Sequence, residues 1–432
     1  SNHNNMQLGY FNYPSPVNEP VLSYAPGSPE KKALKEALAS LKKKTLDIPM
    51  YINGKAVRTG KTKSIHPPHE TKHVLGQFHI GTKLHVEKAI ESALKVRENW
   101  SNMTWETRAH IFLKAAELLA TKYRFEMNAS TMLGQSKNAY QAEIDAACEL
   151  IDFLRFNVHF LSQIYQQQPI SSPGIHNRME WRGLEGFVLA ITPFNFTAIG
   201  GNLPASAAMC GNVVVWKPAN TQIYSAQLFM RILKEAGLPD GVINIVYTDG
   251  PTVGDVCFKH PDFAGVHFTG STGVFNHMWK QIGENISNYK SYPRIVGETG
   301  GKDFVMVHPS ADVDTVVTAL ARGAFEYQGQ KCSAASRVYI PKSKSKEIIQ
   351  SLENQISTIT MGSPRDFEHF MTAVIHENSF DKIVKYIETA KNSNDAEIII
   401  GGDYDKSKGY FISPTIILTS NPNFITMEKE IF

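Results

Sequence analysis

The stretch Phe187-Val-Leu-Ala-Ile-Thr-Pro-Phe-Asn-Phe196 is the clearest indication of the fold in this sequence. A short, continuous apolar run stops at a proline-containing turn, which is typical of a strand buried on both faces of a sheet. Three similar runs follow, at residues 212–216, 242–247 and 265–268. Helical patterns separate the runs and begin near Asn220, Pro251 and Thr272. This α/β alternation predicts a parallel sheet covered by helices on both faces, an architecture often used to bind dinucleotides.

The regions before these strands carry a different pattern. Residues 85–168 place apolar side chains three and four positions apart, which predicts a layer of helices. Nearer the N-terminus, Ser28 followed by Pro29 predicts the start of a helix, because serine caps helix N-termini and proline suits the first helical position. The first 27 residues are rich in Asn, Pro and Tyr without a period, and we expect an extended arm lying on the body.

Length and composition fit a globular protein of several domains. A chain of 432 residues is too long for one compact core, so two or three domains are expected. A second series of strands begins at residues 304–308 and continues at 337–340, which favours a boundary near residues 297–302. The net charge of +3 arises from 44 basic and 41 acidic residues that are mixed along the chain, so nucleic acid is not expected as a partner.

The cysteines and the hydropathy pattern bear on the compartment. Four cysteines without short paired spacing provide neither a metal site nor a disulfide framework, which favours a reducing environment. No apolar stretch has the length of a membrane span, and we do not expect the protein to associate with a membrane. We therefore expect a cytoplasmic protein. Because the chain starts at Ser1 and not at Met, an organelle signal upstream, such as one for the mitochondrial matrix, remains an alternative.

Cys332 is the first candidate for chemistry. It lies in Gly329-Gln-Lys-Cys-Ser-Ala-Ala-Ser-Arg337, whose neighbours are small, polar and basic. A thiol acts as a nucleophile in its thiolate form, which nearby positive charge or unpaired backbone amides favour. Taken alone, the segment supports a nucleophile and a small core residue equally well. The other three cysteines lie in apolar or helical surroundings typical of core residues.

Three further candidates follow predicted strands. Glu298 comes after the strand at 293–296 and stands beside glycines, which suits a general base, although a solvated loop glutamate is an alternative. Asn195 also follows a strand, and its side-chain amide could donate to an oxyanion or serve only as a turn residue. Lys217 could hydrogen-bond a ribose or merely extend along an apolar surface.

Two other patterns are weaker. Gly270 and Ser271 join a strand to a helix and could present amides and a hydroxyl to a pyrophosphate, but the spacing is not the Rossmann fingerprint. A group of histidines suggests a metal site but lacks ligand spacing, and no metal is expected. Its members are His66, His69, His73 and His79.

Six segments in one order resemble the aldehyde dehydrogenase superfamily over nearly the whole chain. They are Pro193-Phe-Asn-Phe196, Trp216-Lys-Pro218, Phe268-Thr-Gly-Ser271, Gly297-Glu-Thr-Gly-Gly-Lys302, Gly329-Gln-Lys-Cys332 and Glu428-Lys-Glu-Ile-Phe432. The resemblance implies an aldehyde dehydrogenase-like fold, with a Rossmann-type NAD-binding domain and an α/β catalytic domain. It also implies that Cys332 is the nucleophile, Glu298 the base and Asn195 an oxyanion donor.

Finer features look like one branch of that family, the 1-pyrroline-5-carboxylate dehydrogenases. The segments that carry this are Gln168-Pro-Ile-Ser171, Arg182-Gly-Leu-Glu-Gly-Phe187, Pro193-Phe-Asn-Phe-Thr-Ala-Ile-Gly-Gly-Asn202, Ala324-Phe-Glu-Tyr327 and Gly329-Gln-Lys-Cys-Ser-Ala334. Phe275 stands where many relatives have glycine, as in this branch. The implied reaction is NAD-dependent oxidation of L-glutamate 5-semialdehyde to L-glutamate in proline catabolism.

The resemblance also assigns binding residues. The cofactor contacts that it implies are Thr192, Lys217, Gly270, Ser271, Thr272, Glu430 and Phe432. Ser333 would help to bind the carboxylate of the substrate. The resemblance implies NAD in preference to NADP, and NADP stays an alternative because Asn220 stands where many relatives carry a glutamate that binds the cofactor's ribose.

The same resemblance implies a domain plan. An N-terminal arm and helix would span residues 1–48, and the NAD-binding domain 49–168 and 183–300. An oligomerisation strand at 169–182 implies a homodimer. Residues 301–432 would form a catalytic domain that is incomplete, because chains of the family continue beyond the Glu-Ile-Phe motif.

Two alternatives to the implied reaction remain open. The first is an aldehyde dehydrogenase for another aldehyde, since one fold hosts many substrates. The second is a folded NAD-binding chain without dehydrogenase activity, since part of the family's substrate site would be missing.

Overall fold

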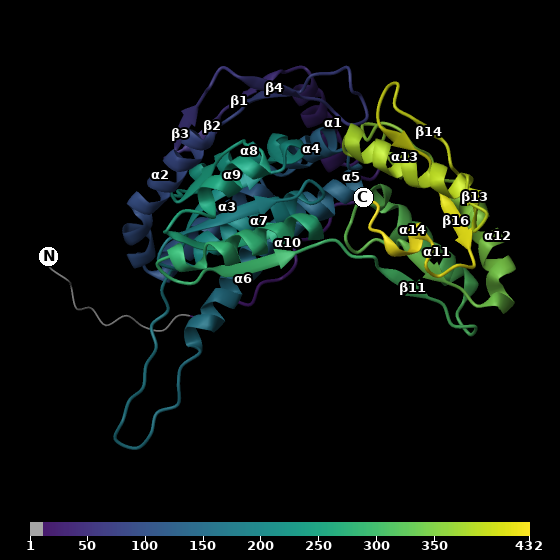
Figure 1. The fold of residues 1–432 in the computed structure, drawn as a ribbon. Coiled ribbons are helices and arrows are strands. Elements are labelled where there is room, and N and C mark those ends of the chain that lie inside the picture. Colours follow the sequence, from purple (N-terminus) through teal and green to yellow (C-terminus); the bar gives the residue numbers. More distant parts are fainter. Residues whose placement is uncertain (1–11) are drawn as a thin grey trace.

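The structure is a computed structural model that describes residues 12–432. Its centre is a seven-stranded sheet with the strand order β10-β9-β6-β7-β8-β2-β3 (Figure 1). In that order the strands are β10 (Arg294–Glu298), β9 (Phe263–Thr269), β6 (Phe187–Thr192), β7 (Val213–Pro218), β8 (Ile243–Ile245), β2 (Met50–Ile52) and β3 (Lys55–Val57). The strands from β10 to β8 run parallel, which confirms the parallel sheet expected from the apolar runs.

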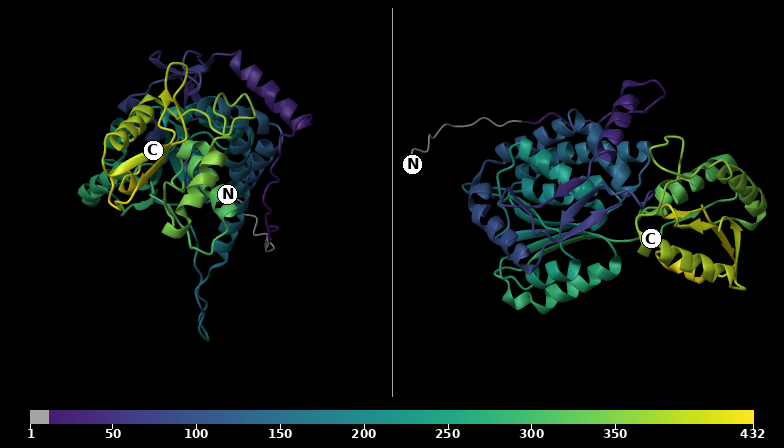
Figure 2. Two further views of the ribbon diagram at one scale, coloured as in Figure 1. Left: turned by 90° about the vertical axis from the view of Figure 1, so that its right-hand side faces the viewer. Right: turned by 90° about the horizontal axis from the view of Figure 1, so that it is seen from above.

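Helices pack on both faces of this sheet, as the views in Figure 2 show. On one face α7 and α8 pack with α3, α4 and α6, and on the other α2 packs with α9. The bounds are α2 (Lys83–Asn102), α3 (Trp105–Ala120), α4 (Arg124–Gln135), α6 (Glu149–Gln166), α7 (Thr197–Met209), η2 (Asn220–Gln222), α8 (Ile223–Glu235), α9 (Gly250–Cys257), α10 (Thr272–Glu284) and η3 (Ile286–Asn288). One hydrophobic core joins these layers and extends from Tyr24 to Tyr289.

The helical layer expected over residues 85–168 is confirmed, with one irregularity. After the short helix α5 (Ala139–Ala142), the chain passes through a turn of π-helix, Glu143–Cys148, before α6 begins. The expected helix start is also confirmed: α1 spans Pro29–Lys42, and the Ser28 hydroxyl accepts a hydrogen bond from the Lys31 amide.

The antiparallel edge of the sheet was not anticipated. β2 and β3 form a hairpin, and β2 joins β8 through Tyr51 and Ile245. The turn consists of Asn53 and Gly54, with φ of 55° and 69°. Asn-Gly is the residue pair preferred by tight hairpin turns with positive φ at both positions, so the dipeptide itself predicts this hairpin.

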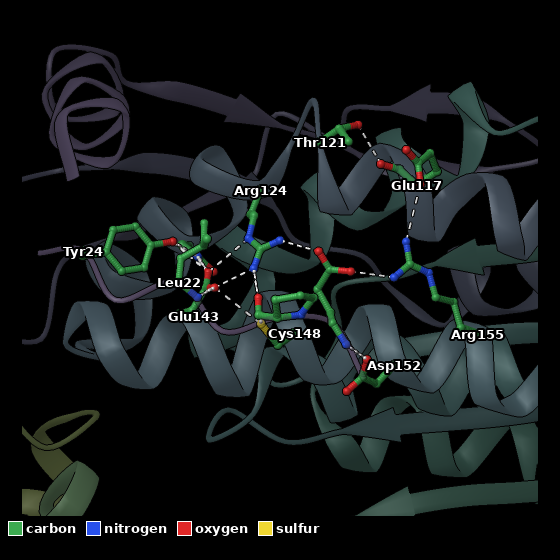
Figure 3. Close-up of polar contacts among 12 residues, drawn as sticks. Leu22, Tyr24, Glu117, Thr121, Arg124, Glu143, Cys148, Asp152 and Arg155 are labelled. Atoms are coloured by element: carbon green, nitrogen blue, oxygen red, sulfur yellow. Dashed lines mark hydrogen bonds and ion pairs between the residues drawn. The ribbon is translucent and has the colours of Figure 1, made fainter. Parts of the chain in front are cut away.

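Residues 12–27 form no helix or strand and lie along the helical layer, as expected; residues 1–11 of the expected arm lie outside the described part. Figure 3 shows how the arm is held. The Glu143 carboxylate accepts hydrogen bonds from the Leu22 amide at 2.7 Å and the Tyr24 hydroxyl at 2.7 Å. It also pairs with Arg124 at 2.6 Å. We call these four residues the arm network.

Removing the centre of the arm network should destabilise the fold strongly. Glu143→Ala leaves Glu19 as the only carboxylate paired with the buried Arg124 guanidinium, and it removes the acceptor of the Leu22 amide and the Tyr24 hydroxyl, among other groups. Removing one partner of a buried ion pair typically destabilises a protein by about 3–5 kcal/mol. The free energy of unfolding, measured in urea, should therefore fall by that amount. Glu235→Ala is the matched control, because its pair with Lys122 is exposed and should matter little. Equal stability of the two variants would contradict this account.

A second body follows β10 and has its own two cores, one centred on residues such as Leu320 and Ile348 and one on Phe380 and Ile387. Figure 1 shows it beside the first body, with the described C-terminus near their junction. Its elements are β11 (Phe304–Met306), α11 (Val313–Phe325), η4 (Glu326–Gly329), β12 (Arg337–Tyr339), η5 (Lys342–Lys344), α12 (Ser345–Ile356), α13 (Glu377–Lys391), β13 (Ala396–Ile400), β14 (Tyr404–Asp405), β15 (Phe411–Ile412), β16 (Ile416–Thr419) and α14 (Ile425–Glu428).

A small sheet of β1 (Leu46–Ile48), β5 (Gly76–His79) and β4 (Thr62–Ile65) lies outside the main sheet. Among residues 12–432, no helix has the length and apolar character needed to cross a bilayer.

The segment 169–182 differs from its expectation. It projects from the end of α6 as a two-armed loop without a strand (Figure 1). The side chain of Gln168 bonds both the amide and the carbonyl of Met179, which closes the base of the loop. Beyond that base the loop is exposed, with Ile170 89% accessible. A strand needs a neighbouring strand for its backbone bonds, and the described chain offers none there.

Candidate active site

The carboxyl ends of four parallel strands form a row at one edge of the main sheet. In register, Glu298 on β10 pairs with Thr269 on β9, and Ile191 on β6 lies between Phe268 on β9 and Lys217 on β7. Ligands of open α/β sheets bind outside the carboxyl ends of the strands. The structure therefore brings Thr192, Lys217 and Glu298 together along the edge where the sequence placed them.

The start of α10 offers part of what the sequence predicted. The Gly270 amide donates to the Glu298 carbonyl at 3.1 Å, so it is already used. The Ser271 hydroxyl caps the helix by accepting from the Val274 amide at 3.3 Å, which leaves its own O–H as a donor. The amides of Thr272 and Gly273 lie in the first helical turn, where backbone donors have no partner within the helix. The Ser271 hydroxyl and these two amides are the donors that this helix end can present to an anion.

Thr192 and Lys217 stand at neighbouring strand ends but differ in availability. The Thr192 hydroxyl accepts from the Trp216 indole at 2.9 Å and donates to Gln222 at 3.3 Å, so it serves the core. Burial lowers the pKa of Lys217, and the Asp249 carboxylate opposes that shift. Of these two side chains, that of Lys217 therefore keeps its ammonium group available to a ligand.

Cys332 and Glu298 face each other. The Cys332 Sγ lies 3.8 Å from the Glu298 Oε1. Burial raises the pKa of the Cys332 thiol above its ordinary value, and the negative charge of Glu298 raises it further. The backbone amides of Ser333 and Cys332 itself act in the opposite direction and favour the thiolate. Ser333 is exposed beside the thiol.

The basic neighbour of the thiol does not have the role that the sequence suggested. Lys331 points to Asp145 at 3.0 Å and to Glu326 at 3.3 Å, so its charge is neutralised by carboxylates. Of the two sources of thiolate stabilisation considered from sequence, the structure supplies the backbone amides and not the lysine.

This geometry predicts the pH dependence of thiol alkylation. Because the pKa of Cys332 is raised, its labelling by iodoacetamide should increase with pH through the alkaline range. Glu298→Gln removes the charge that adds to the shift, so its profile should move to lower pH. Glu284→Gln, an exposed position at the end of α10, should leave the profile unchanged. Peptide mass spectrometry assigns the label to Cys332; a profile unaffected by Glu298→Gln would contradict the proposed contact.

Asn195 connects the first body to the loop that carries the thiol. It is 6% exposed, and its Nδ2 donates to the Gln330 carbonyl at 3.0 Å, two residues before Cys332. An amide group carries a second N–H, which remains available. The Asn195 side chain thus holds an N–H donor beside the backbone that leads to Cys332.

The C-terminal motif returns to the same junction. The Glu430 carboxylate accepts from the Gly301 amide and faces Lys302; burial raises the pKa of Glu430, and Lys302 opposes that shift. The Phe432 ring stands edge-on to Phe194, with centroids 6.4 Å apart. Phe194 immediately precedes Asn195, so the C-terminal residue packs against the loop that follows β6 at the edge of the sheet.

Sequence reasoning missed a buried chain of charges beneath this junction. Lys137 is fully buried and binds Asp145 at 2.7 Å, and Asp145 binds Lys331 in turn. The Lys137 ammonium also lies 4.4 Å from the ring centroids of both Phe196 and Tyr327. Burial lowers the pKa of Lys137 to about 8, although Asp145 opposes this. No local sequence signal distinguishes these residues from surface charges, because their partners are distant along the chain.

Three of the four clustered histidines use ring nitrogens in separate hydrogen bonds. His69 bonds the Ser136 hydroxyl, and His79 bonds Asp47 at 2.6 Å. His66 bonds the His73 carbonyl. Within residues 12–432, the group with ligand-like spacing is instead Asp366, Glu368 and His369, which lies at the surface.

Comparison with known proteins identifies the family. The profile described as "Aldehyde dehydrogenase family" matches residues 55–432. The chain belongs to the aldehyde dehydrogenase family. This confirms the family resemblance and the fold class expected from the six segments, and the match contains both the row of strand ends and Cys332.

Individual members of the aldehyde dehydrogenase family are similar over nearly the whole chain. The mitochondrial delta-1-pyrroline-5-carboxylate dehydrogenase of Dictyostelium discoideum is 50% identical over 424 residues, which cover 98% of this chain and 76% of that protein. The Agaricus bisporus delta-1-pyrroline-5-carboxylate dehydrogenase is 50% identical over 430 residues, covering 99% and 78%. The crystal structure of the Mycobacterium tuberculosis delta-pyrroline-5-carboxylate dehydrogenase bound with NAD superposes with a TM-score of 0.94 at 48% identity, covering 96% and 78%.

Proposed function

We propose that this protein catalyses the NAD-dependent oxidation of L-glutamate 5-semialdehyde, formed when 1-pyrroline-5-carboxylate opens in water, to L-glutamate. The reaction class rests on one observation, the thiol of Cys332 placed 3.8 Å from the Glu298 carboxylate at the carboxyl edge of a dinucleotide-type sheet. The substrate rests on the relatives of 50% identity, which are named for that reaction. The proposal places this chain in proline catabolism.

In the proposed first step, the Cys332 Sγ attacks the aldehyde carbon. The thiol proton passes to solvent water, and the carbonyl oxygen becomes an oxyanion as the S–C bond forms. The free N–H of the Asn195 amide and the backbone amide of Cys332 are the donors that would stabilise this charge. The product of the step is a thiohemiacetal on Cys332.

The second half of the reaction completes the oxidation and releases the acid. Bound NAD would supply the acceptor for the hydride that leaves the thiohemiacetal carbon. The carbon then remains bound to Cys332 as a thioester. Glu298 takes a proton from water, and the resulting hydroxide attacks the thioester. The C–S bond breaks and the carboxylic acid departs, while the proton held by Glu298 passes to the Cys332 sulfur and restores the thiol. Glu298 is well placed for this task because its carboxylate already contacts the sulfur.

Residues on the sheet edge fit a dinucleotide. The free amides of Thr272 and Gly273 suit a phosphate, and the Lys217 ammonium suits a hydroxylated sugar. Glu430 and Phe432 are proposed contacts near the nicotinamide end, because both lie by the Cys332 junction. Thr192 and Gly270 would have to contact the cofactor through atoms other than those already bonded, whereas the O–H of the Ser271 hydroxyl can donate to a phosphate.

The remaining sequence-based proposals concern substrate binding, oligomeric assembly, domain boundaries and location in the cell. Ser333, exposed beside Cys332, is proposed to bind the substrate carboxylate. The exposed loop 169–182 is proposed to gain its strand by pairing with a second subunit, which would make a homodimer. The proposed domains are 49–168 with 183–300 for NAD and 301–432 for catalysis. A cytoplasmic location is proposed, or the mitochondrial matrix in a eukaryote, as in the Dictyostelium relative.

A comparison of substrates tests this proposal. NADH formation should be fastest, at matched concentrations, with glutamate 5-semialdehyde and slower with propanal and succinic semialdehyde. The absent amino group of succinic semialdehyde and the absent carboxylate of propanal make them informative controls. A clear preference for either control aldehyde would replace the proposed substrate while leaving the aldehyde dehydrogenase reaction intact.

A further inference from the structure

The three residues that precede the Cys332 loop adopt an unusual backbone conformation. Tyr327 and Gln328 have φ of 49° and 56°, and Gly329 has φ of 70°. A left-handed conformation is strained for residues other than glycine, and it persists only where surrounding contacts enforce it. The turn Tyr327–Gly329, which we call the left-handed turn, therefore raises the question of what holds it.

The side chain of Gln328 holds the left-handed turn against a buried segment of the second body. Its Nε2 donates to the Thr372 hydroxyl at 2.9 Å and to the Ala373 carbonyl at 2.9 Å. Its Oε1 accepts from the Thr372 amide at 2.8 Å. Thr372 and Ala373 are themselves almost completely buried, so these bonds exchange little with water. One side chain thus makes three hydrogen bonds with a fixed partner.

The first body holds the same turn from the opposite side. The Tyr327 hydroxyl donates to the carbonyl of Gln135 at 2.6 Å, at the end of α4. The next residue, Ser136, accepts from the Thr372 hydroxyl and, at 3.2 Å, from the Ala373 amide. The contacts therefore form a closed ring that runs from α4 to Tyr327, Gln328, Thr372 and back to α4.

The ring continues directly into the candidate active site. The Gln330 side chain accepts from the Ile375 amide at 3.0 Å, and its carbonyl accepts from Asn195 at 3.0 Å. Cys332 follows two residues later. The backbone that carries the thiol is thus fixed at Tyr327, Gln328 and Gln330 before it reaches the position opposite Asn195.

We propose that Gln328 is a positioning residue for Cys332, which clamps the left-handed turn onto Thr372 and Ala373 and so fixes the thiol relative to Asn195. Gln328 does not touch the thiol or Glu298; it acts through the backbone of residues 329–331. The catalytic consequence of this inference rests on the proposed function. A nucleophile displaced by about 1 Å can slow a reaction roughly 100-fold. The placement of the thiol itself does not depend on that function.

Two substitutions of Gln328 distinguish its hydrogen bonds to Thr372 and Ala373 from its place in the left-handed turn. Gln328→Gly removes the clamp but adopts positive φ without strain, so a residue needed only for the turn would tolerate it. Gln328→Glu keeps nearly the same shape and the acceptor for the Thr372 amide, but loses both donated bonds. Gln350→Ala is the matched control, because Gln350 is an exposed glutamine of α12 in the same body.

Three readouts decide the proposal: NADH formation, NAD affinity by calorimetry, and the pH profile of Cys332 alkylation read by peptide mass spectrometry. For both Gln328 variants we expect kcat to fall by about tenfold or more and the alkylation profile to change, with NAD affinity retained. Gln350→Ala should match the parent in all three. If the parent itself shows no turnover, the proposed function fails, whereas the alkylation profiles still test the clamp.

Two results would overturn the proposal. One is an alkylation profile and kcat of Gln328→Gly equal to those of the parent, which would make Gln328 a plain turn residue. The other is the loss of the folded state in both Gln328→Gly and Gln328→Glu, measured by thermal unfolding. That outcome would make Gln328 a residue of global stability and not a positioning residue.

Discussion

Cys332→Ala is expected to abolish NADH formation with pyrroline-5-carboxylate while NAD binding persists. The substitution removes the sulfur that lies 3.8 Å from Glu298, and with it the covalent route from aldehyde to thioester. The change is small and the side chain is only half-buried, so the fold should tolerate it. The measurement is the rate of NADH absorbance at saturating NAD, with NAD binding followed by calorimetry.

The other cysteines supply the controls for this experiment. Cys257 is fully buried in α9, where burial raises its thiol pKa far above the ordinary range, so it cannot replace Cys332 as a nucleophile. Cys257→Ala should therefore retain turnover per folded molecule. Turnover retained by Cys332→Ala would refute the assignment of the nucleophile, whatever the behaviour of the control.

Asn195→Ala is expected to lower kcat by roughly 100- to 1,000-fold, the range found when one oxyanion donor is removed from an enzyme. The substitution removes the amide whose second N–H is free near Cys332. It also removes the bond to the Gln330 carbonyl, which could move the loop. The pH profile of Cys332 alkylation separates these effects, because a displaced loop changes the profile and a lost donor to the substrate does not.

Asn157→Ala is a suitable control for the Asn195 experiment. Asn157 is a partly buried asparagine of α6 that bonds Asn202 on α7 and not the nucleophile loop. Its substitution should leave kcat unchanged. A kcat for Asn195→Ala close to that of Asn157→Ala would show that Asn195 is not an oxyanion donor.

The features that the sequence predicted are those encoded by local patterns. The apolar runs that became β6, β7 and β9 are buried on both faces, so each run is continuous and easily recognised. The position of Asn195 followed from the first of these runs and that of Glu298 from the strand predicted at 293–296, because parallel strands bring their carboxyl ends to one edge. Cys332 could be assigned a role only from the joint order of the segments, since its own neighbourhood was ambiguous.

The features that escaped prediction depend on partners far apart in the chain. Lys137 was not singled out and Lys331 was considered only as a basic neighbour of the thiol, but the chain brings both to Asp145. Gln328 bonds residues 44 and 45 positions later, and no spacing rule connects them. The hairpin at Asn53 and Gly54 is the exception, because its signal was local and could have been recognised.

The expected strand at 169–182 illustrates a different limit. Its sequence suits an extended segment, but a strand exists only when another strand supplies its hydrogen bonds. In one subunit the bonds at its base come from the Gln168 side chain, and the rest of the segment remains a loop. The proposed homodimer would provide the missing neighbour.

The most direct test of the account is the stoichiometry of product formation by this 432-residue chain with NAD and pyrroline-5-carboxylate. NADH and L-glutamate are measured in the same reaction, by absorbance and by amino-acid analysis. The account predicts that both accumulate in equal amounts and that neither forms with Cys332→Ala. Binding of NAD without formation of either product would contradict it, and would show a dinucleotide-binding chain that does not catalyse the oxidation.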